Sequence, residues 1–314
     1  MRIRAPSRLH LGLIRTSCSR MDEVQRNRRY YGGIGLMVDS PEIEVCVNKS
    51  HIWTIRGQSV DRVLGYIKRI ISRRYCEDRP LSILVEKCPD THVGLGVGTQ
   101  LALAVGIAIL SSNSNHDYKV STTELAKLLL RGKRSAVGAY GFSYGGMIVE
   151  YGKDSEQSIS PLVSCVRLPL DWRIILLRSH CVHHKKWFGK KENEAINGSV
   201  SYDYVRLVRL IEMEILPAAS MGDFKRFSHA IFEYNYLCGV PFKRYQGGDY
   251  APETEEMLSY IRSLGIYGCG QSSWGPTAFA FVENNFIAAR IGRLLGNRFS
   301  VHVTNISSGY TTSN

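Results

Sequence analysis

A glycine-rich turn in front of an apolar stretch constrains the fold of this chain more than any other feature. Three alternate glycines and two polar residues come first: Gly94, Gly96, Gly98, Thr99 and Gln100. An almost wholly apolar run then continues to Leu110, and a strand pattern precedes the turn at residues 81–88. This order predicts a strand, a glycine loop and a buried helix, whose N-terminal N–H groups and partial positive charge suit an anion. The alternative is a tight turn that needs glycine only for close packing.

Strand and helix patterns alternate along the rest of the chain and favour an α+β fold with helices covering a sheet. A strand is expected at 1–14, and two more within 33–49, separated by a turn at Ser40-Pro41. Residues 133–146 are expected to form a Gly- and Tyr-rich loop before a strand at 147–151, and Thr122 or Thr123 is the expected N-cap of the preceding helix. Later strands are expected at 172–179, 266–270, 278–282 and 299–304, and helices at 59–75, 122–132, 202–219, 223–236, 252–264 and 285–296.

The length and composition indicate an ordinary globular protein. At 314 residues the chain is long enough for two domains, and it is 44% hydrophobic. It has no apolar run of the roughly 18 residues that a membrane span needs, and no signal peptide at its N-terminus, so we expect a cytoplasmic protein. Its eight cysteines form no CxxC pair, and Cys181-Val182-His183-His184 lacks zinc spacing, which favours reduced thiols.

A surplus of basic residues points to an anionic ligand. The chain has 40 Lys and Arg against 28 Asp and Glu, a formal net charge of +12. Nucleic acid, a membrane surface or a small phosphorylated substrate could each be attracted by such a charge. Basic residues are dense at 68–75 and 183–191, and Arg15, Arg20, Arg26, Arg28 and Arg29 gather near the N-terminus. A solvated basic face is the simpler interpretation of any single run.

Several motifs spread over most of the chain resemble those of the GHMP kinase superfamily. Residues 89–96 are similar to its P-x-x-x-G-L-G phosphate loop, with one extra residue after the proline. Within the superfamily the chain most resembles the β-ribofuranosylaminobenzene 5′-phosphate synthases of methanopterin biosynthesis. The motifs that carry this resemblance are SRLH at 7–10, GGIGL at 32–36, HVGLGVGTQ at 92–100, GKRS at 132–135, YGFSYGG at 140–146 and GQSSWGPT at 270–277.

The resemblance implies a transferase that joins 4-aminobenzoate or 4-hydroxybenzoate to phosphoribosyl pyrophosphate, with release of pyrophosphate and carbon dioxide. It also implies Mg²⁺ as cofactor, a homodimer, and a two-domain α+β fold with the ligand cleft between the domains. We place these domains at 1–160, with the glycine loop, and 161–314, a ferredoxin-like unit. Each domain is expected to hold a mixed or antiparallel sheet covered by helices. No nucleic-acid or membrane partner is expected.

An ATP-dependent kinase of the same superfamily is the alternative function. Such kinases commonly carry a catalytic Asp in a Gly-rich segment, several residues before a Gly-Gly pair, whereas residues 134–146, RSAVGAYGFSYGG, contain no acidic residue. Some kinases of the superfamily act without this base, so its absence weakens the kinase hypothesis but does not exclude it. A nucleic-acid-binding protein is a third hypothesis, but no recognisable motif supports it.

The candidate site residues come from the same motifs. Arg8 and His10 share one strand face, and with His92 they are our candidates for catalysis. The candidates for binding substrate or phosphate are Ser7, Gly94, Gly96, Gly98, Thr99, Gln100, Lys133, Arg134, Ser135, Gln271, Ser272 and Ser273. This chain has Val97 where the synthases usually have Ser, so Thr99 is the candidate hydroxyl for phosphate or metal.

Each candidate also has a structural alternative. These are a sheet edge for Arg8 and His10, a structural hydrogen bond for His92, a favourable helix C-terminus for Lys133 and Arg134, and a hairpin loop for 271–273. Gln246-Gly247-Gly248 and Lys190-Lys191-Glu192 are weaker candidates for ligand contact. We expect Gly96→Ala to impair use of the anionic substrate more than folding.

Overall fold

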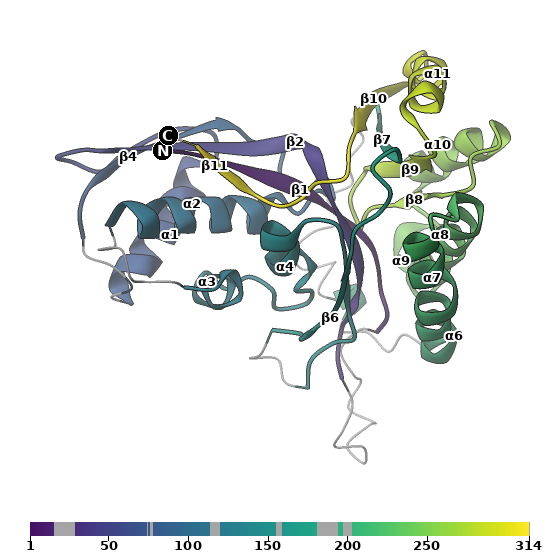
Figure 1. The fold of residues 1–314 in the computed structure, drawn as a ribbon, viewed down its shortest axis with the longest axis horizontal. Helices are drawn as coiled ribbons and strands as arrows, with labels where there is room; N and C mark the ends of the chain where they lie inside the picture. The colour runs from purple at the N-terminus through teal and green to yellow at the C-terminus, as the bar shows by residue number, and fades with distance from the viewer. Residues whose placement is uncertain are drawn as a thin grey trace.

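Two β-sheets organise the chain, each with its own helices (Figure 1). The computed structural model describes residues 1–15, 29–73, 75, 78–113, 120–154, 159–180, 194–196 and 203–313. The α+β class is confirmed, with one mixed and one antiparallel sheet. Among the described residues, no helix has the length and hydrophobicity needed to cross a bilayer.

The first sheet has the strand order β11-β1-β2-β4-β3, and β5 pairs with β2 and with β6. Its strands are β1 (Arg2–Leu13), β2 (Gly33–Lys49), β3 (Thr54–Gly57), β4 (Leu81–Lys87), β5 (Met147–Glu150), β6 (Leu162–Val166) and β11 (Thr311–Ser313). The β1–β11 pairing brings the two ends of the chain together, as Figure 1 shows. Because β6 and β11 come from beyond residue 160, this sheet takes strands from both expected domains, and the division at 160 stays a prediction.

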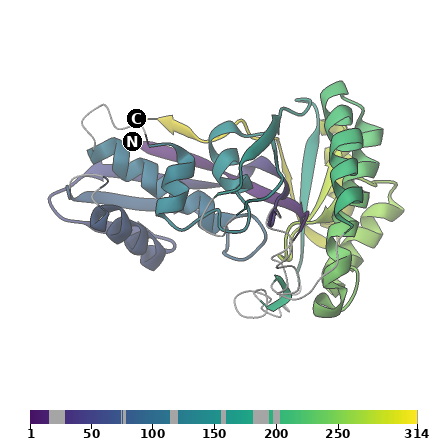
Figure 2. The ribbon, with the colours of Figure 1, turned by 90° about the horizontal axis from the view of Figure 1, so that it is seen from below.

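Four helices pack on one face of the first sheet (Figures 1 and 2). They are α1 (Val60–Ser72), α2 (Val97–Asn113), α3 (Thr122–Leu128) and α4 (Val137–Tyr144). The central helix α2 contacts β1, β2 and the three other helices. That position explains its sequence, because a helix surrounded by protein is apolar on every side. The helix that the glycine loop predicts is therefore confirmed.

The second sheet is antiparallel, with the strand order β10-β7-β9-β8. Its strands are β7 (Arg173–Ser179), β8 (Cys269–Gln271), β9 (Ala278–Val282) and β10 (Phe299–Thr304). The helical segments are α6 (Tyr204–Leu210), a π-helix (Ile211–Ile215), α7 (Leu216–Met221), α8 (Phe224–Gly239), a 3-10 helix (Val240–Phe242), α9 (Lys243–Gln246), α10 (Pro252–Ser263) and α11 (Asn285–Gly296). The predicted helix at 285–296 and strand at 299–304 match α11 and β10.

Three local predictions are wrong. Residues 33–49 form one strand without a turn at Ser40-Pro41, because β1 pairs along both halves of β2. Residues 137–144 form α4 where a loop was expected. Its glycines permit close packing, since a β-carbon at Gly141 would fall 2.3 Å from Met37 Sδ. The N-cap of α3 is Ser121, whose side chain accepts a hydrogen bond from the Glu124 N–H and completes a capping box.

Candidate functional site

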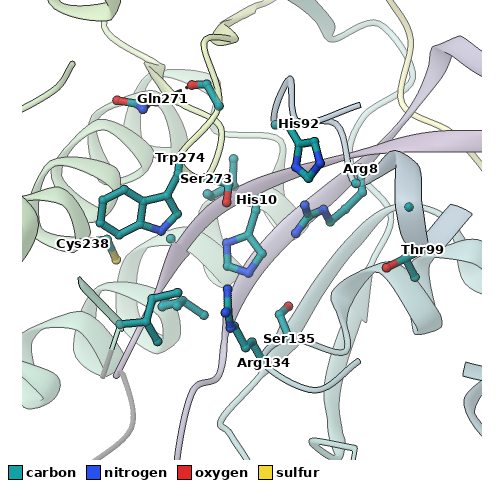
Figure 3. A pocket seen from close by; sticks show the side chains of 18 of the residues that line it. Arg8, His10, His92, Thr99, Arg134, Ser135, Cys238, Gln271, Ser273 and Trp274 are labelled. Carbon is teal, nitrogen blue, oxygen red and sulfur yellow. Dashed lines mark hydrogen bonds between the residues drawn. The ribbon is translucent and has the colours of Figure 1, made fainter. Parts of the chain in front are cut away.

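A cavity of about 610 Å³ lies between residues of the first and second sheets (Figure 3). One wall comes from β1, α1, the glycine loop, the start of α2 and residues 130–135. The other comes from Ile196, α8, α9 and the segment around the β8–β9 hairpin. Twelve of the fifteen predicted site residues line it: Arg8, His10, His92, Gly94, Gly96, Gly98, Thr99, Lys133, Arg134, Ser135, Gln271 and Ser273. The fold therefore brings segments from both halves of the sequence to one place.

The three other predicted residues are buried, and their side chains form hydrogen bonds within the protein. The Ser7 hydroxyl donates to the Pro41 carbonyl, and Gln100 Nε2 donates to the Gly138 carbonyl at 2.8 Å. The Ser272 hydroxyl donates to the Gly94 carbonyl at 2.7 Å and accepts from the His10 N–H at 3.1 Å. Ser272 thus joins the hairpin, the glycine loop and β1.

The glycines of the loop serve different purposes. Gly94 and Gly96 have φ values of 87° and 67°, and a β-carbon at Gly96 would fall 2.8 Å from Arg8 Nε. These two positions require glycine for the backbone alone, so Gly96→Ala would also strain the fold and does not separate binding from folding. Gly98 has no such constraint: a β-carbon there would lie 3.4 Å from Arg131 Nη1, an ordinary contact, and would project beside the cavity.

Five cationic side chains line the first wall: Arg8, Arg62, Arg131, Lys133 and Arg134. No acidic residue stands among the described residues of the lining. Arg62 Nη2 lies 3.3 Å from His92 Nε2, and Arg131 Nη2 donates to the Tyr66 hydroxyl at 2.7 Å. Like charges gathered at a helix N-terminus repel one another until an anion neutralises them. This wall therefore has the charge that attracts a polyanion.

Two of these cations, Arg62 and Arg131, were not among the predicted site residues. Arg62 falls in a predicted helix and Arg131 directly precedes the GKRS motif, so only adjacency to that motif could have indicated Arg131. Several segments named in the sequence analysis lie outside the described residues. They are the basic run at 183–191, Cys181–His184, Lys190–Glu192 and the residues Arg20, Arg26 and Arg28.

His10 lies at the centre of the cavity in Figure 3, beside Arg8 and Arg134. Only 4% of the residue is exposed, and within the described part of the chain its Nε2 has no hydrogen-bond partner. Burial, and then the charge of Arg8, lowers the pKa of His10 well below its usual value. The imidazole is therefore neutral near pH 7 and keeps one nitrogen for a ligand.

Strained backbone is concentrated around the cavity. Three of the five non-glycine residues with positive φ in the described chain line it: His92 at 67°, Leu130 at 56° and Ser273 at 57°. Ser273 is held by its own N–H, which donates to the His10 carbonyl at 2.9 Å. Such conformations cost about 1–3 kcal/mol each and tend to mark functional sites.

The second wall has a different chemistry. The residues that it contributes beyond position 190 carry no charge: Ile196, Asn235, Cys238, Gly239, Phe242, Gln246, Tyr250, Gln271, Ser273, Trp274 and Gly275. Phe242 and Trp274 meet edge to face, with ring centroids 4.3 Å apart. The weaker candidate Gln246 belongs to this wall, and its Nε2 donates to the Asp249 carbonyl at 2.6 Å. A cavity with one cationic wall and one uncharged wall that carries aromatic rings suits a phosphorylated and an aromatic ligand together.

The described lining offers few ligands to a metal. Its neutral oxygen donors include the hydroxyls of Thr99, Ser135 and Ser273. The nearby carboxylate of Glu150 is buried and accepts the Ala136 N–H at 2.9 and 3.1 Å, and burial raises its pKa. A group of Glu44, Cys46 and Glu86 elsewhere is occupied by ion pairs to Arg2 and Lys87. A divalent metal at this cavity would therefore need most of its ligands from an anion bound with it.

Three curated relatives match nearly the whole chain, although no family model matches it. The beta-ribofuranosylphenol 5′-phosphate synthase of Archaeoglobus fulgidus is 29% identical over 319 residues, covering 96% of this chain and 93% of the relative. The synthase of the same name from Methanothermobacter thermautotrophicus is 26% identical, covering 94% and 93%. The one from Methanocaldococcus jannaschii is 27% identical, covering 92% of each.

Solved structures of low sequence identity share the fold. Homoserine kinase from Cytophaga hutchinsonii has a TM-score of 0.67 at 16% identity, over 99% of this chain and 96% of that one. Mevalonate pyrophosphate decarboxylase from Streptococcus pyogenes has a TM-score of 0.66 at 11% identity, over 98% and 96%. The resemblance that the motifs indicate is thereby confirmed: this chain has the GHMP kinase fold and is a relative of the beta-ribofuranosylphenol 5′-phosphate synthases.

Proposed function

We propose that this chain is a β-ribofuranosylphenol or β-ribofuranosylaminobenzene 5′-phosphate synthase. It would join 4-hydroxybenzoate or 4-aminobenzoate to phosphoribosyl pyrophosphate and release pyrophosphate and carbon dioxide. The observation that carries the proposal is the division of one cavity into a wall of five cations without a described carboxylate and an opposite wall that is uncharged and aromatic. The names of the three full-length relatives support it.

The cationic wall would bind the donor through its two phosphorylated groups. Arg8, Arg62 and Arg131 lie around the start of α2, whose N-terminus adds its own partial positive charge. Lys133 and Arg134 line the same cavity and add to its positive charge. In our proposal these residues stabilise the negative charge that develops as the bond between ribose C1 and the pyrophosphate oxygen breaks.

The chemistry needs positioning more than acid–base catalysis. The electron pair of the breaking C1–O bond leaves with pyrophosphate, and the ring carbon that carries the carboxylate forms a bond to ribose C1. The bond to the carboxylate carbon then breaks, its electron pair restores the aromatic ring, and carbon dioxide leaves. Neutral His10, whose Nε2 has no partner among the described residues, would orient a group of the phosphoribosyl donor by hydrogen bonding.

Mg²⁺ is part of the proposal. The described lining has hydroxyls and no carboxylate. The phosphates of the phosphoribosyl donor would therefore supply most of the ligands of the ion, with the Thr99 hydroxyl as the candidate protein ligand. When bound, the ion would neutralise charge on the leaving pyrophosphate.

One assay separates the synthase from a kinase of the same fold. Purified protein is incubated with phosphoribosyl pyrophosphate, Mg²⁺ and carboxyl-labelled 4-hydroxybenzoate or 4-aminobenzoate, and labelled carbon dioxide is measured. We expect its release to require the donor. No release from either acid, together with ADP formation from ATP and a small alcohol, would replace the synthase with the kinase.

A cytoplasmic location, a homodimeric state and a role in methanopterin biosynthesis remain proposals that rest on the sequence. Sedimentation equilibrium of the purified protein tests the dimer.

A further inference from the structure

A tyrosine behind the cationic wall holds one of the arginines of that wall in place. Tyr66 lies on α1, is only 6% exposed and is absent from the cavity lining. Its hydroxyl accepts a hydrogen bond from Arg131 Nη2 at 2.7 Å and donates one to the Gly98 carbonyl at 3.3 Å. The Arg131 cation also lies 5.4 Å from the centroid of the Tyr66 ring. One buried side chain therefore joins Arg131 to the first turn of α2.

The tyrosine hydroxyl fixes the guanidinium without neutralising it. An arginine side chain has many rotamers, and a preformed contact removes the free-energy cost of ordering it when a ligand binds. A carboxylate would hold Arg131 too, but it would cancel the positive charge that attracts an anion. A tyrosine hydroxyl carries no charge near neutral pH. Among the ion pairs between described residues, none includes Arg131, so its charge is held in place and is not neutralised there.

A second arginine, from the same helix as Tyr66, approaches the same point. Arg62 lies one turn before Tyr66 on α1, so the two side chains share a face of the helix. A β-carbon at Gly98 would lie 3.4 Å from Arg131 Nη1 and 3.8 Å from Arg62 Nη1. Both guanidinium groups therefore border the start of α2, which has no acidic residue in its first turn and whose first N–H groups have no partner within the helix. Helix α1 thus contributes to this cationic region directly through Arg62 and indirectly through Tyr66.

We propose that Tyr66 is a positioning residue for the pyrophosphate group of the donor, because its hydroxyl holds the Arg131 guanidinium against the N-terminus of α2. This inference rests on the proposed function, which assigns the phosphorylated donor to the cationic wall. Charges that are already oriented stabilise a developing anion without having to move as it forms. The same hydroxyl also binds the Gly98 carbonyl, so the arginine and the start of α2 keep a fixed relation to each other. Tyr66 touches no substrate in this arrangement and acts through Arg131.

A double-mutant cycle with pyrophosphate affinity as its readout tests this role. Pyrophosphate with Mg²⁺ is titrated calorimetrically, at constant salt, into the wild type, Tyr66→Phe, Arg131→Met and the double variant. Phenylalanine keeps the ring beside Arg131 and removes only the hydroxyl. Tyr140→Phe is the matched control, because the Tyr140 hydroxyl also donates to a backbone carbonyl, that of Ser160 at 3.1 Å, and Tyr140 does not line the cavity. The melting temperature of each variant is recorded, and all titrations are run well below the lowest of them.

We expect Tyr66→Phe to raise the Kd for pyrophosphate about 3- to 10-fold, whereas Tyr140→Phe should stay within about twofold of the wild type. With Met at position 131, loss of the Tyr66 hydroxyl should have no further effect, because the guanidinium that it positions is gone. A general loss of stability would instead weaken binding in both backgrounds. The positive charge remains in Tyr66→Phe, so the salt dependence of its Kd should match that of the wild type, while that of Arg131→Met should be weaker.

Three results would overturn the positioning role: an unchanged Kd in Tyr66→Phe, a loss of the same size with and without Arg131, or a wild type that binds no pyrophosphate. The release of labelled carbon dioxide by the wild type then shows whether the proposed function survives. If the wild type neither binds pyrophosphate nor releases carbon dioxide, the proposed function itself fails, and this inference fails with it.

Discussion

Replacing Arg131 by Met should uncouple ligand binding from stability at the cationic wall. The guanidinium is held in place, since Nη2 donates to the Tyr66 hydroxyl at 2.7 Å and the cation lies 5.4 Å from the Tyr66 ring centroid. It also covers the start of α2, where Nη1 would be 3.4 Å from a β-carbon at Gly98. The residue also lines the cavity, so its charge lies beside the space where an anion would bind. Methionine keeps the length of the side chain and removes the charge.

The size of the effect follows from these contacts. A hydrogen bond between charged groups contributes about 1.5–3 kcal/mol, which corresponds to an increase of about 10- to 150-fold in the Kd for pyrophosphate. The free energy of unfolding should change little. Loss of the hydrogen bond to Tyr66 costs about 1 kcal/mol, and the relief of repulsion among the remaining cations offsets part of it.

Calorimetric titration with pyrophosphate at about 0.1 M salt measures the binding, and thermal unfolding measures the stability. Arg290→Met, which removes an exposed cation from α11, controls for net charge. The reasoning is refuted if Arg131→Met binds pyrophosphate within twofold of the wild type, or if Arg290→Met weakens binding as much.

Three further predictions concern the same cavity. Gly98→Ala should weaken pyrophosphate binding at unchanged melting temperature, whereas Gly96→Ala should lower the free energy of unfolding by about 1–2 kcal/mol because its φ is 67°; equal effects of both on stability would contradict the distinction. Because the pKa of folded His10 is depressed mainly by burial, the unfolded protein takes up the proton first. Stability should therefore fall as pH drops below about 6.5, and His10→Gln should reduce that fall in denaturant titrations at pH 7.5 and 5.5; an unchanged pH dependence would argue against it. Raising NaCl from about 0.05 to 0.5 M should increase the Kd for pyrophosphate several-fold, and a Kd independent of salt would contradict an electrostatic wall.

Local pattern was enough for most helices and strands. The glycines before an apolar run gave the strand, loop and helix that lead into α2, and periodicity placed α10, α11 and β10 within a residue or two. It failed where distant segments decide the conformation. Residues 137–144 are rich in glycine and tyrosine, yet they become helical because Met37 and α2 pack against them. The short strand β11 exists only because β1 offers it an edge.

For the candidate site, too, the sequence predicted what depends on neighbouring residues and missed what depends on distant ones. The motifs identified twelve residues of the lining, because a glycine loop and basic residues at element ends bear their chemistry locally. Ser7, Gln100 and Ser272 lie in the same motifs, but their side chains are buried in hydrogen bonds to distant backbone carbonyls, which spacing along one segment does not reveal.

The sequence by itself determined that a glycine loop leads into a buried helix, since the loop and the helix N-terminus are consecutive residues, and this is a place that suits an anion. Only the tertiary structure decided what faces that loop. Arg62 and Arg131 reach the glycine loop from α1 and from the end of the α3 region, and Phe242, Tyr250 and Trp274 face it from the other half of the chain. The division of the cavity into a cationic and an uncharged wall depends on contacts between residues more than a hundred positions apart, and such contacts leave no local periodicity in the sequence.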